Sequence, residues 1–253
     1  MRISVIKIGG SVLTGPTAYR RTAAFIAARL CETPGDRLVV VISAEHGTTD
    51  ALLDTARNIV AEPDPATLDL LWSTGETRAA ALLVFWLHAI GVRAAAVNVH
   101  QAGLVEPDDT GAPGRSHLRA LRLRCVLAHH DVVVAPGFLA RGAGDSVVSL
   151  GRGGSDLTAV LLAAGLGAAR CELVKDVPGY FSADPNEDPS AQQLPTIEID
   201  RAIAMAEAGC ELVQRDALEA ARERRLPLVV RSLDGPCATV VEHGPPRVTW
   251  IGT

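Results

Sequence analysis

The sequence predicts an α/β fold in which a mostly parallel sheet is covered by helices on both faces. Two observations predict it. Along the 253 residues, short runs rich in β-branched residues alternate with longer segments rich in alanine and leucine. One run, LVVVIS at 38–43, is apolar without interruption, as is typical of a strand buried on both faces. Alternation of strands and helices implies right-handed crossovers, so successive strands should run parallel in one sheet.

The elements of the first half follow in the same alternation. We expect strands at 3–8, 38–43, 94–99 and 131–135, and helices at 19–31, 49–61, 76–91 and 116–129. Thr48 or Thr49 can cap the second of these helices, because a short hydroxyl side chain can accept from the first free backbone N–H groups. Gly91 can end the third helix.

The second half continues the pattern with fewer strands. We expect helices at 155–166, 199–209 and 216–224, and strands at 172–175 and 226–232. Two segments, 106–115 and 182–193, are rich in proline, glycine and acidic residues. Long loops in a compact fold are often lids or binding loops. For 106–115, an insertion that the fold tolerates explains the composition equally well.

Composition and charge narrow the class of protein. Apolar residues make up 48% and charged residues 21%, and the formal net charge is −5, so the basic excess of a nucleic-acid-binding protein is absent. Apolar runs fall short of the roughly 18 residues that a membrane span needs. The five cysteines are far apart and form no CxxC pair, as expected of reduced thiols. We therefore expect a cytoplasmic protein with a small-molecule ligand and neither a nucleic-acid nor a membrane partner.

Four glycine-bearing turns follow predicted strands. They are KIGGS at 7–11, SAEHGTTD at 43–50, PGF at 136–138 and GRGGSD at 151–156. Ligands of open α/β sheets bind beyond the carboxyl ends of the strands, where such turns converge. Glycine lets backbone N–H groups approach an anion, and a helix N-terminus adds a favourable dipole. The turns match neither the GxxxxGK[ST] nor the GxGxxG pattern, so an ordinary P-loop or dinucleotide fold is not indicated.

Charged residues in these turns suit an anionic ligand. Lys7 beside a glycine pair suits a phosphate, although a lysine at a strand end can also simply face water. Arg152 can grip a carboxylate with a bidentate fork. Gly153 and Gly154 would leave room for a ligand against the backbone.

Three further features of these turns have ordinary structural explanations. Ser155 can cap the helix that follows, and Asp156 can be an acid favoured by the helix dipole. Lys175-Asp176, with the Pro-Gly turn after it, can be no more than a turn. An arginine, two glycines and an acid before a buried helix are nevertheless more than capping requires.

Together these segments resemble the amino acid kinase superfamily and, within it, the aspartokinase catalytic domain. The resemblance rests on KIGGS, SAEHGTTDALL, STGE, APGF with LGRGGSDLTAVLLA, KDVPGYFSADP, and AIAMAEAGCELVQRDALEAARERRLPLVVRS, in that order. It covers about residues 3–235. Several motifs in preserved order are far more specific than any one of them.

The resemblance implies one amino acid kinase domain over 1–253, folded as a three-layer αβα sandwich. Residues 1–145 would form the acid-binding lobe and 146–253 the nucleotide-binding lobe. The implied reaction transfers the γ-phosphoryl group of ATP, with Mg²⁺ on its phosphates, to the side-chain carboxylate of a small amino acid, above all L-aspartate. Two alternatives stay open: the same chemistry on another small acid, or a nucleotide-binding relative without catalysis.

The resemblance also implies roles for individual residues. Lys7 would stabilise charge on the transferring phosphoryl group and Asp156 would orient that lysine. Glu76 would meet the α-ammonium of the substrate; the alternative is an acid at a helix N-terminus, stabilised by about 0.3–1 kcal/mol. The remaining implied residues are Gly9, Gly10, Ser11, Lys175, Asp176, Tyr180 and Asp184 for the nucleotide and its phosphates, and Thr49, Phe138, Arg152, Gly153, Gly154 and Ser155 for the acid.

The sequence departs from the aspartokinase pattern at several places. Thr77-Arg78 stands where a serine is usual near the GE motif, Asn186 replaces an arginine, and Gln214-Arg215 replaces His-Pro. The paired ACT regulatory domains of typical aspartokinases have no counterpart in the sequence, so we expect no feedback inhibition through them. Relatives commonly self-associate, so we expect a homodimer or a higher homo-oligomer.

Overall fold

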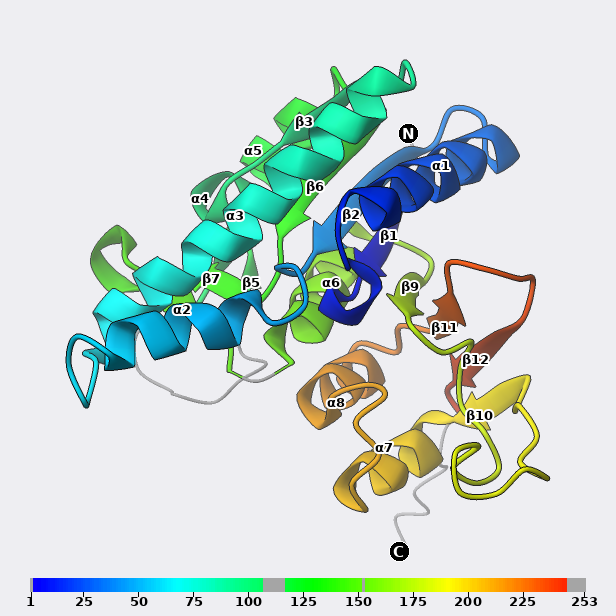
Figure 1. The fold of residues 1–253 in the computed structure, drawn as a ribbon. Coiled ribbons are helices and arrows are strands. Elements are labelled where there is room, and N and C mark those ends of the chain that lie inside the picture. Colours follow the sequence, from blue (N-terminus) through cyan, green and yellow to red (C-terminus); the bar gives the residue numbers. More distant parts are fainter. Residues whose placement is uncertain (1, 107–116, 152, 245–253) are drawn as a thin grey trace, which may run out of the picture.

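An eight-stranded sheet runs through the protein in a computed structural model that describes residues 2–106, 117–151 and 153–244 (Figure 1). The strand order is β10-β12-β11-β9-β1-β2-β6-β3. Every neighbouring pair is parallel except β11 with β12. The strands are β1 (Ile3–Ile8), β2 (Arg37–Ile42), β3 (Ala94–Ala96), β6 (Val132–Pro136), β9 (Cys171–Lys175), β10 (Thr196–Glu198), β11 (Leu228–Ser232) and β12 (Ala238–Glu242). The expected mostly parallel sheet is confirmed.

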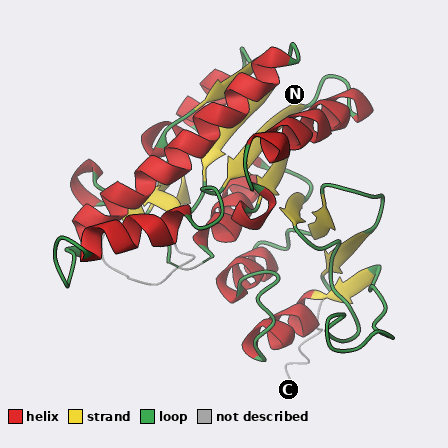
Figure 2. Cartoon of the chain, in the orientation of Figure 1, coloured by secondary structure: helices red, strands yellow, loops and turns green. Residues whose placement is uncertain are grey.

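Helices lie on both sides of this sheet and complete a three-layer sandwich (Figure 2). Val39 and Val41 of β2 pack into the core under one helix layer, whereas Val40 and Ile42 pack into the core on the other face. This alternation explains why the strand reads as a continuous apolar run. The helices are α1 (Pro16–Glu32), α2 (Thr48–Arg57), α3 (Pro65–Ala89), α4 (Val99–Ala102), α5 (Leu121–Leu127), α6 (Gly154–Leu166), α7 (Ile199–Glu207) and α8 (Arg215–Glu223).

The start of α3 differs from the expectation. The helix begins at Pro65 rather than at residue 76, and Asp64 caps it by accepting a 2.8 Å hydrogen bond from the backbone N–H of Thr67. Gly75 inside the helix lets α3 pack tightly on α2, because a β-carbon there would lie 3.0 Å from Cγ2 of Thr48. Glu76 is therefore in the middle of a long helix, and the helix-dipole explanation for it is wrong.

The expected caps of two other helices are also wrong. The residue before α2 is Gly47, with φ 76°, and the residue before α6 is Gly153, with φ 75°. A glycine has no side chain that could accept a hydrogen bond from the first turn, so neither helix has a side-chain cap. Thr48, Thr49 and Ser155 consequently lie at or inside the first turns and are available for other contacts.

A small second sheet, which the sequence did not reveal, lies beside the main one. Its order is β5-β4-β7-β8, formed by β4 (Leu104–Val105), β5 (His117–Leu118), β7 (Leu139–Arg141) and β8 (Val147–Ser149). The helix expected at 116–129 is replaced by β5 and the shorter α5, apart from residue 116, which lies outside the described residues. Leu118 is held as a strand residue against α6, since a β-carbon on Gly165 would lie 2.7 Å from Cβ of Leu118.

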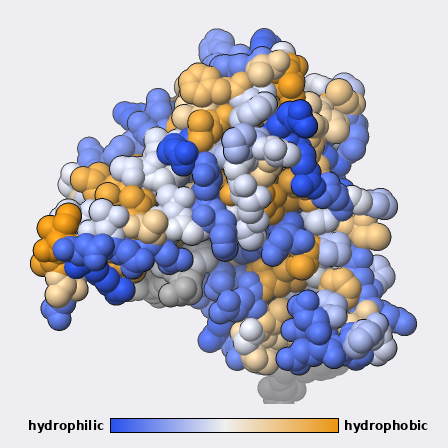
Figure 3. All heavy atoms as spheres, viewed as in Figure 1, coloured by the Kyte–Doolittle hydropathy of each residue, from blue (hydrophilic) through white to orange (hydrophobic). Residues whose placement is uncertain are grey.

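The surface of the described residues is mixed in character. Figure 3 shows hydrophobic residues scattered among hydrophilic ones on the visible face. Phe85 of α3 is 69% exposed, and Ile90 just after this helix is also exposed. Within the described ranges, no helix combines the length and apolar character that crossing a membrane would require.

Candidate active site

The carboxyl ends of β1, β2, β6 and β9 meet at one edge of the sheet, where a cavity of about 610 Å³ opens. The cavity therefore lies where ligands of open α/β sheets bind. Most residues expected in the site line it, namely Lys7, Gly10, Ser11, Thr49, Glu76, Phe138, Gly153, Gly154, Ser155, Asp156 and Lys175. The structure thus brings together the four glycine-bearing turns, although the functional role of each residue stays a prediction.

A buried carboxylate joins two lysines at the base of this cavity. Oδ1 of Asp156 lies 2.8 Å from Nζ of Lys7, and Oδ2 accepts a 2.7 Å hydrogen bond from Nζ of Lys175. The three side chains are only 7%, 2% and 12% exposed in the order Lys7, Asp156, Lys175. Lys7 is at the end of β1, Lys175 at the end of β9, and Asp156 in the first turn of α6. The ion pairs therefore tie two adjacent strands to one helix.

Electrostatics keep Asp156 ionised in this setting. Burial by itself would raise the pKa of Asp156, but the charges of Lys7 and Lys175 and their hydrogen bonds hold that pKa at about 2. The pKa of Lys175 is lowered, chiefly by burial and also by the charge of Lys7, against the pull of Asp156. Two ammonium groups share one carboxylate, so the base of the cavity has positive charge left over for an anionic ligand.

Glu76 of α3 also lines this cavity, but its carboxyl group, unlike that of Asp156, has a raised pKa. Its side chain is buried, and Oε2 has no hydrogen-bond partner among the residues that the structure describes. Burial raises the pKa of Glu76 to about 8, although the backbone amides of Ala44 and Gly137 and the charge of Lys7 act in the opposite direction. A cationic ligand group beside Glu76 would favour its ionised form, so this residue suits an ammonium group.

Glycines allow the turns to approach one another closely. A β-carbon on Gly10 would lie 2.7 Å from the carbonyl oxygen of Ala44, and one on Gly137 would lie 2.6 Å from Oγ of Ser155. Real β-carbons do not approach other atoms so closely, so side chains at these two positions would push the turns apart. The glycines after β1 and β6 therefore set the width of the cavity.

An aromatic pair forms one wall of the cavity. The rings of Trp72 and Phe138 meet edge to face with centroids 5.7 Å apart, and Nε1–H of Trp72 donates to the carbonyl oxygen of Thr49 at 3.2 Å. Phe138 has φ 67°, a strained left-handed conformation for a side-chain-bearing residue. Trp72 was not identified from the sequence. Trp72 precedes Glu76 by one helical turn, so the two share a face of α3, but this relationship can be seen only once α3 is known to begin at Pro65.

Two more polar residues of the cavity were not expected to belong to it. Glu45, after β2, accepts hydrogen bonds of 3.1 Å from the hydroxyl of Tyr19 and from Nη1 of Arg78. Gln214, just before α8, lines the cavity in contact with Gly153. Both belong to segments on which the family resemblance rests, SAEHGTTDALL and the segment at 202–232, but no role was assigned to either residue there.

The other expected nucleotide residues, Gly9, Asp176, Tyr180 and Asp184, do not line this cavity. Gly9 donates its backbone N–H to the carbonyl oxygen of Val174 at 3.0 Å, and Asp176 accepts a 3.2 Å hydrogen bond from Oγ of Ser11. Tyr180 and Asp184 line a second cavity of about 460 Å³, together with Asn186 and Cys210 among others. The hydroxyl of Tyr180 is buried without a hydrogen-bond partner in the described part of the chain, and burial raises its pKa. Arg152 lies outside the described residues.

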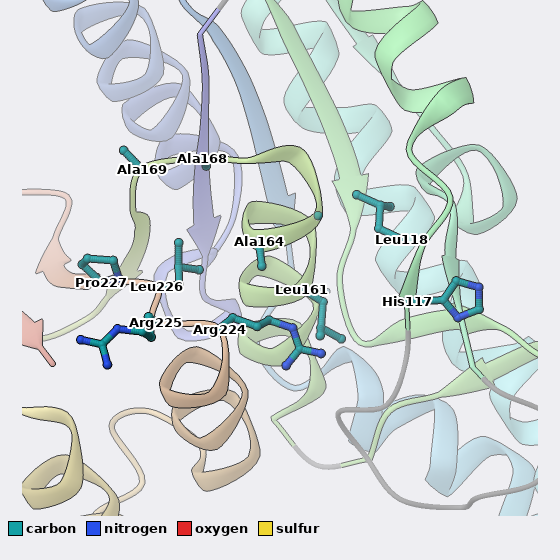
Figure 4. Close-up of a pocket in the computed structure, with 11 residues that line it drawn as sticks. His117, Leu118, Leu161, Ala164, Ala168, Ala169, Arg224, Arg225, Leu226 and Pro227 are labelled. Atoms are coloured by element: carbon teal, nitrogen blue, oxygen red, sulfur yellow. The ribbon is translucent and has the colours of Figure 1, made fainter. Parts of the chain in front are cut away.

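A further cavity of about 500 Å³ lies at the far end of α6 (Figure 4). Leu161 and Ala164 of α6 form one side of it, and Leu226 with Arg225 borders another. Because Asp156 is at the opposite end of α6, this cavity does not belong to the candidate site. Across residues 2–106, 117–151 and 153–244, no group of three His, Cys, Asp or Glu side chains is placed to hold a metal ion.

Comparisons with known proteins agree with this geometry. A family model described as "Amino acid kinase family" matches residues 2–232. The aspartokinase of Mycolicibacterium smegmatis is 37% identical over 239 residues, which cover 92% of this chain and 55% of the relative. The chain spans about half the length of the curated relatives it matches.

Solved structures show the same relationship. The crystal structure of an aspartate kinase from Synechocystis superposes with a TM-score of 0.84 at 35% identity, covering 97% of this chain and 40% of that one. E. coli aspartokinase III in complex with aspartate and ADP has a TM-score of 0.76 at 25% identity, covering 97% and 66%. The sheet order, the converging glycine turns and these matches lead to one conclusion: the chain belongs to the amino acid kinase family.

Proposed function

We propose that this protein transfers the γ-phosphoryl group of ATP to the side-chain carboxylate of a small acidic amino acid, with L-aspartate as the first candidate. The observation that carries the proposal is the Lys7–Asp156–Lys175 cluster facing the buried Glu76 across one cavity. An anion-binding base and a buried acid in one cavity suit a reaction between a phosphate and a zwitterion. That the relatives are aspartokinases supports aspartate as the acceptor.

The nucleotide would occupy the half of the site formed by residues 146–253. The cavity lined by Tyr180 and Asp184 suits the base and sugar; Val177 lines this cavity, and Lys175, two residues earlier, lines the larger one. Mg²⁺ would bind the phosphates of ATP and neutralise part of their charge. Asp156 is a poor metal ligand because both its oxygens are engaged by lysines, so in this proposal the protein itself supplies cations and backbone N–H groups.

The acid would occupy the half of the site formed by residues 1–145. Glu76 would bind its α-ammonium group, and Thr49 and Phe138 would line its pocket with Ser155 at the junction. Arg152 is proposed for the α-carboxylate on the resemblance of its motif alone. Because Trp72 closes one wall behind Phe138, the pocket favours a short side chain.

The chemistry needs positioning and charge neutralisation but no general base. At neutral pH the acceptor carboxylate is already ionised, so one of its oxygens can attack the γ-phosphorus directly. The new P–O bond forms as the bond to the β,γ-bridging oxygen breaks, giving an acyl phosphate and ADP. Lys7 would stabilise charge on the transferring group, and Asp156 would hold Lys7 in place.

We place this activity in the cytoplasm, where ATP is available, and expect a homodimer or larger homo-oligomer. The oligomeric state can be measured by light scattering on the purified chain.

The test of the function is a coupled ADP-release assay with MgATP and L-aspartate, in which hydroxylamine traps the acyl phosphate. Release of ADP with matching hydroxamate, abolished in Lys7→Met, is the expected result. A panel of other small acids belongs in the same experiment, because the Glu45–Arg78 pair beside the acid pocket favours a different small acid as the second candidate. If every acid fails to release ADP, the kinase proposal is wrong.

A further inference from the structure

Gln214 lies directly over the glycine turn at the start of α6. A β-carbon built on Gly153 would lie 1.8 Å from Cγ and 2.4 Å from Cδ of Gln214. The side chain of Gln214 therefore occupies the space beside Gly153 that any other residue would need. It lines the same cavity as Lys7, Asp156 and Lys175.

The fold itself makes no use of the carboxamide of Gln214. The residue is the N-cap of α8, with φ −64° and ψ 141°, yet its side chain makes no capping hydrogen bond. In the described ranges the carboxamide has no hydrogen-bond partner, although its aliphatic part packs on Gly153. A partly buried amide that borders an anion-binding cavity is available to a ligand.

We propose that the carboxamide of Gln214 donates its Nε2–H to a non-bridging oxygen of the terminal phosphoryl group of ATP; this rests on the proposed kinase function. Gln214 lines the same cavity as the lysine–aspartate cluster and contacts the turn that leads into Asp156, whereas it does not line the cavity that holds Tyr180 and Asp184. Its contact should therefore be with the terminal phosphate and not with the rest of the nucleotide.

Most of the acid half of the cavity is built by other elements, and only the turn of Gly153 and Ser155 at the start of α6 is shared between the two halves. Thr49 comes after β2, Glu76 belongs to α3, and Phe138 comes after β6. Gln214 and Lys175, in contrast, come from the second half of the chain. This division favours the phosphoryl group over the acceptor as the ligand of Gln214. A neutral donor at this position would bind the phosphoryl group together with the two lysines. It would add no charge to a site that already holds two ammonium groups.

Two substitutions separate a ligand contact from mere packing. Gln214→Met keeps an unbranched side chain over Gly153 but removes the donor, and Gln214→Glu keeps the shape but adds a negative charge. Arg215→Met is the matched control, because Arg215 is the next residue, is 55% exposed, and pairs with Glu207 and Glu219 away from the cavity.

The experiment measures the dissociation constants of a non-hydrolysable MgATP analogue and of MgADP by calorimetry, for the wild type and all three variants. We expect Gln214→Met to weaken the analogue about tenfold, as for a lost hydrogen bond to a charged group, and Gln214→Glu to weaken it further. ADP affinity should not change in Gln214→Met, and in Gln214→Glu it should fall less than the affinity for the analogue, because the added charge also repels the β-phosphate. Arg215→Met should match the wild type for both nucleotides.

Each other outcome overturns the proposal in a distinct way. Equal weakening of the analogue and ADP would show that Gln214 only supports the turn. Unchanged nucleotide affinity with a raised KM for the acid would assign Gln214 to the acceptor, and no change in any constant would leave it without a ligand role. A wild-type protein that binds neither nucleotide would overturn the kinase function itself, a result distinguishable from failure of the Gln214 variants alone.

Discussion

Oδ1 of Asp156 lies 2.8 Å from Nζ of Lys7, although the two residues come from opposite halves of the chain. The carboxylate also binds Lys175, so one buried anion positions the only two lysines in the described part of the cavity. Removing the carboxylate of Asp156 would leave the two largely buried ammonium groups of Lys7 and Lys175 without a counter-charge. The pair therefore links the stability of the fold to the geometry of the proposed site.

Asp156→Asn should damage stability and activity together. The amide keeps the shape of the carboxylate but leaves two buried lysines without their counter-charge, which costs about 3–5 kcal/mol when one partner of a buried ion pair is lost. Urea denaturation at pH 7 should show a lower free energy of unfolding, and ADP release should fall by about two orders of magnitude. Unchanged stability would mean that the lysines find other partners.

Glu76 should make stability depend on pH in a direction opposite to that of most carboxylates. Its folded-state pKa is raised to about 8 from the ordinary 4.5, mainly by burial, so the folded protein keeps a proton that the unfolded chain releases. The stability that this group contributes is therefore fully present below about pH 4.5 and is lost as the pH rises through about 8. Glu76→Gln cannot ionise and should escape this loss.

Thermal melts of wild type and Glu76→Gln at pH 5 and pH 9 test this expectation. The two proteins should melt at similar temperatures at pH 5, and the variant should melt higher at pH 9. The comparison between the two proteins cancels the titration of Asp156, whose low pKa acts at the other end of the pH range. A constant difference at both pH values would show that Glu76 does not titrate in the folded protein.

The sequence predicted those parts of the fold whose local pattern and tertiary environment agree. The apolar run of β2 and the glycine-led, apolar α6 appear within one residue of their expected bounds. The first part of α3 was missed because it contains Pro65, Ser73 and Gly75, which suggest a turn. In the structure Oγ of Ser73 donates to the carbonyl oxygen of Leu70 within the helix, and Gly75 faces Thr48 and Ala44 at close range.

Some residues of the candidate site could be predicted from the sequence and others could not. Residues in glycine turns after strands could be predicted because backbone geometry restricts what may stand there, and Lys7 and Asp156 belong to such turns. Trp72 and Gln214 could not be predicted, since each reaches the cavity only through the packing of a helix against a turn. Such contacts depend on helix placement, which no local motif specifies.

Gly137→Ala should disrupt the junction between the two halves of the site. The added methyl group would lie 2.6 Å from Oγ of Ser155, so α6 or the turn after β6 must move, at a cost of about 1–3 kcal/mol. A lower melting temperature and a raised KM for the acid are expected. Gly244→Ala is the control, because its β-carbon would meet only an oxygen of Glu198 at 3.9 Å. Equal melting temperatures for the two variants would contradict the assigned role of Gly137.

If the proposed function holds, Trp72→Ala should change which acid the protein prefers as acceptor. The indole packs edge to face on Phe138 in the cavity wall and donates a hydrogen bond to the carbonyl oxygen of Thr49, so its removal opens space at the end of the proposed acid pocket. We expect kcat/KM for aspartate to fall and the ratio of glutamate to aspartate turnover to rise about tenfold, since discrimination by one methylene group is worth roughly 1–3 kcal/mol. The measurement is the hydroxamate assay with both acids. Leu70→Ala, an exposed position on the same helix, should leave the ratio unchanged. If Trp72→Ala lowers turnover of both acids by the same factor, Trp72 supports the pocket without setting its length.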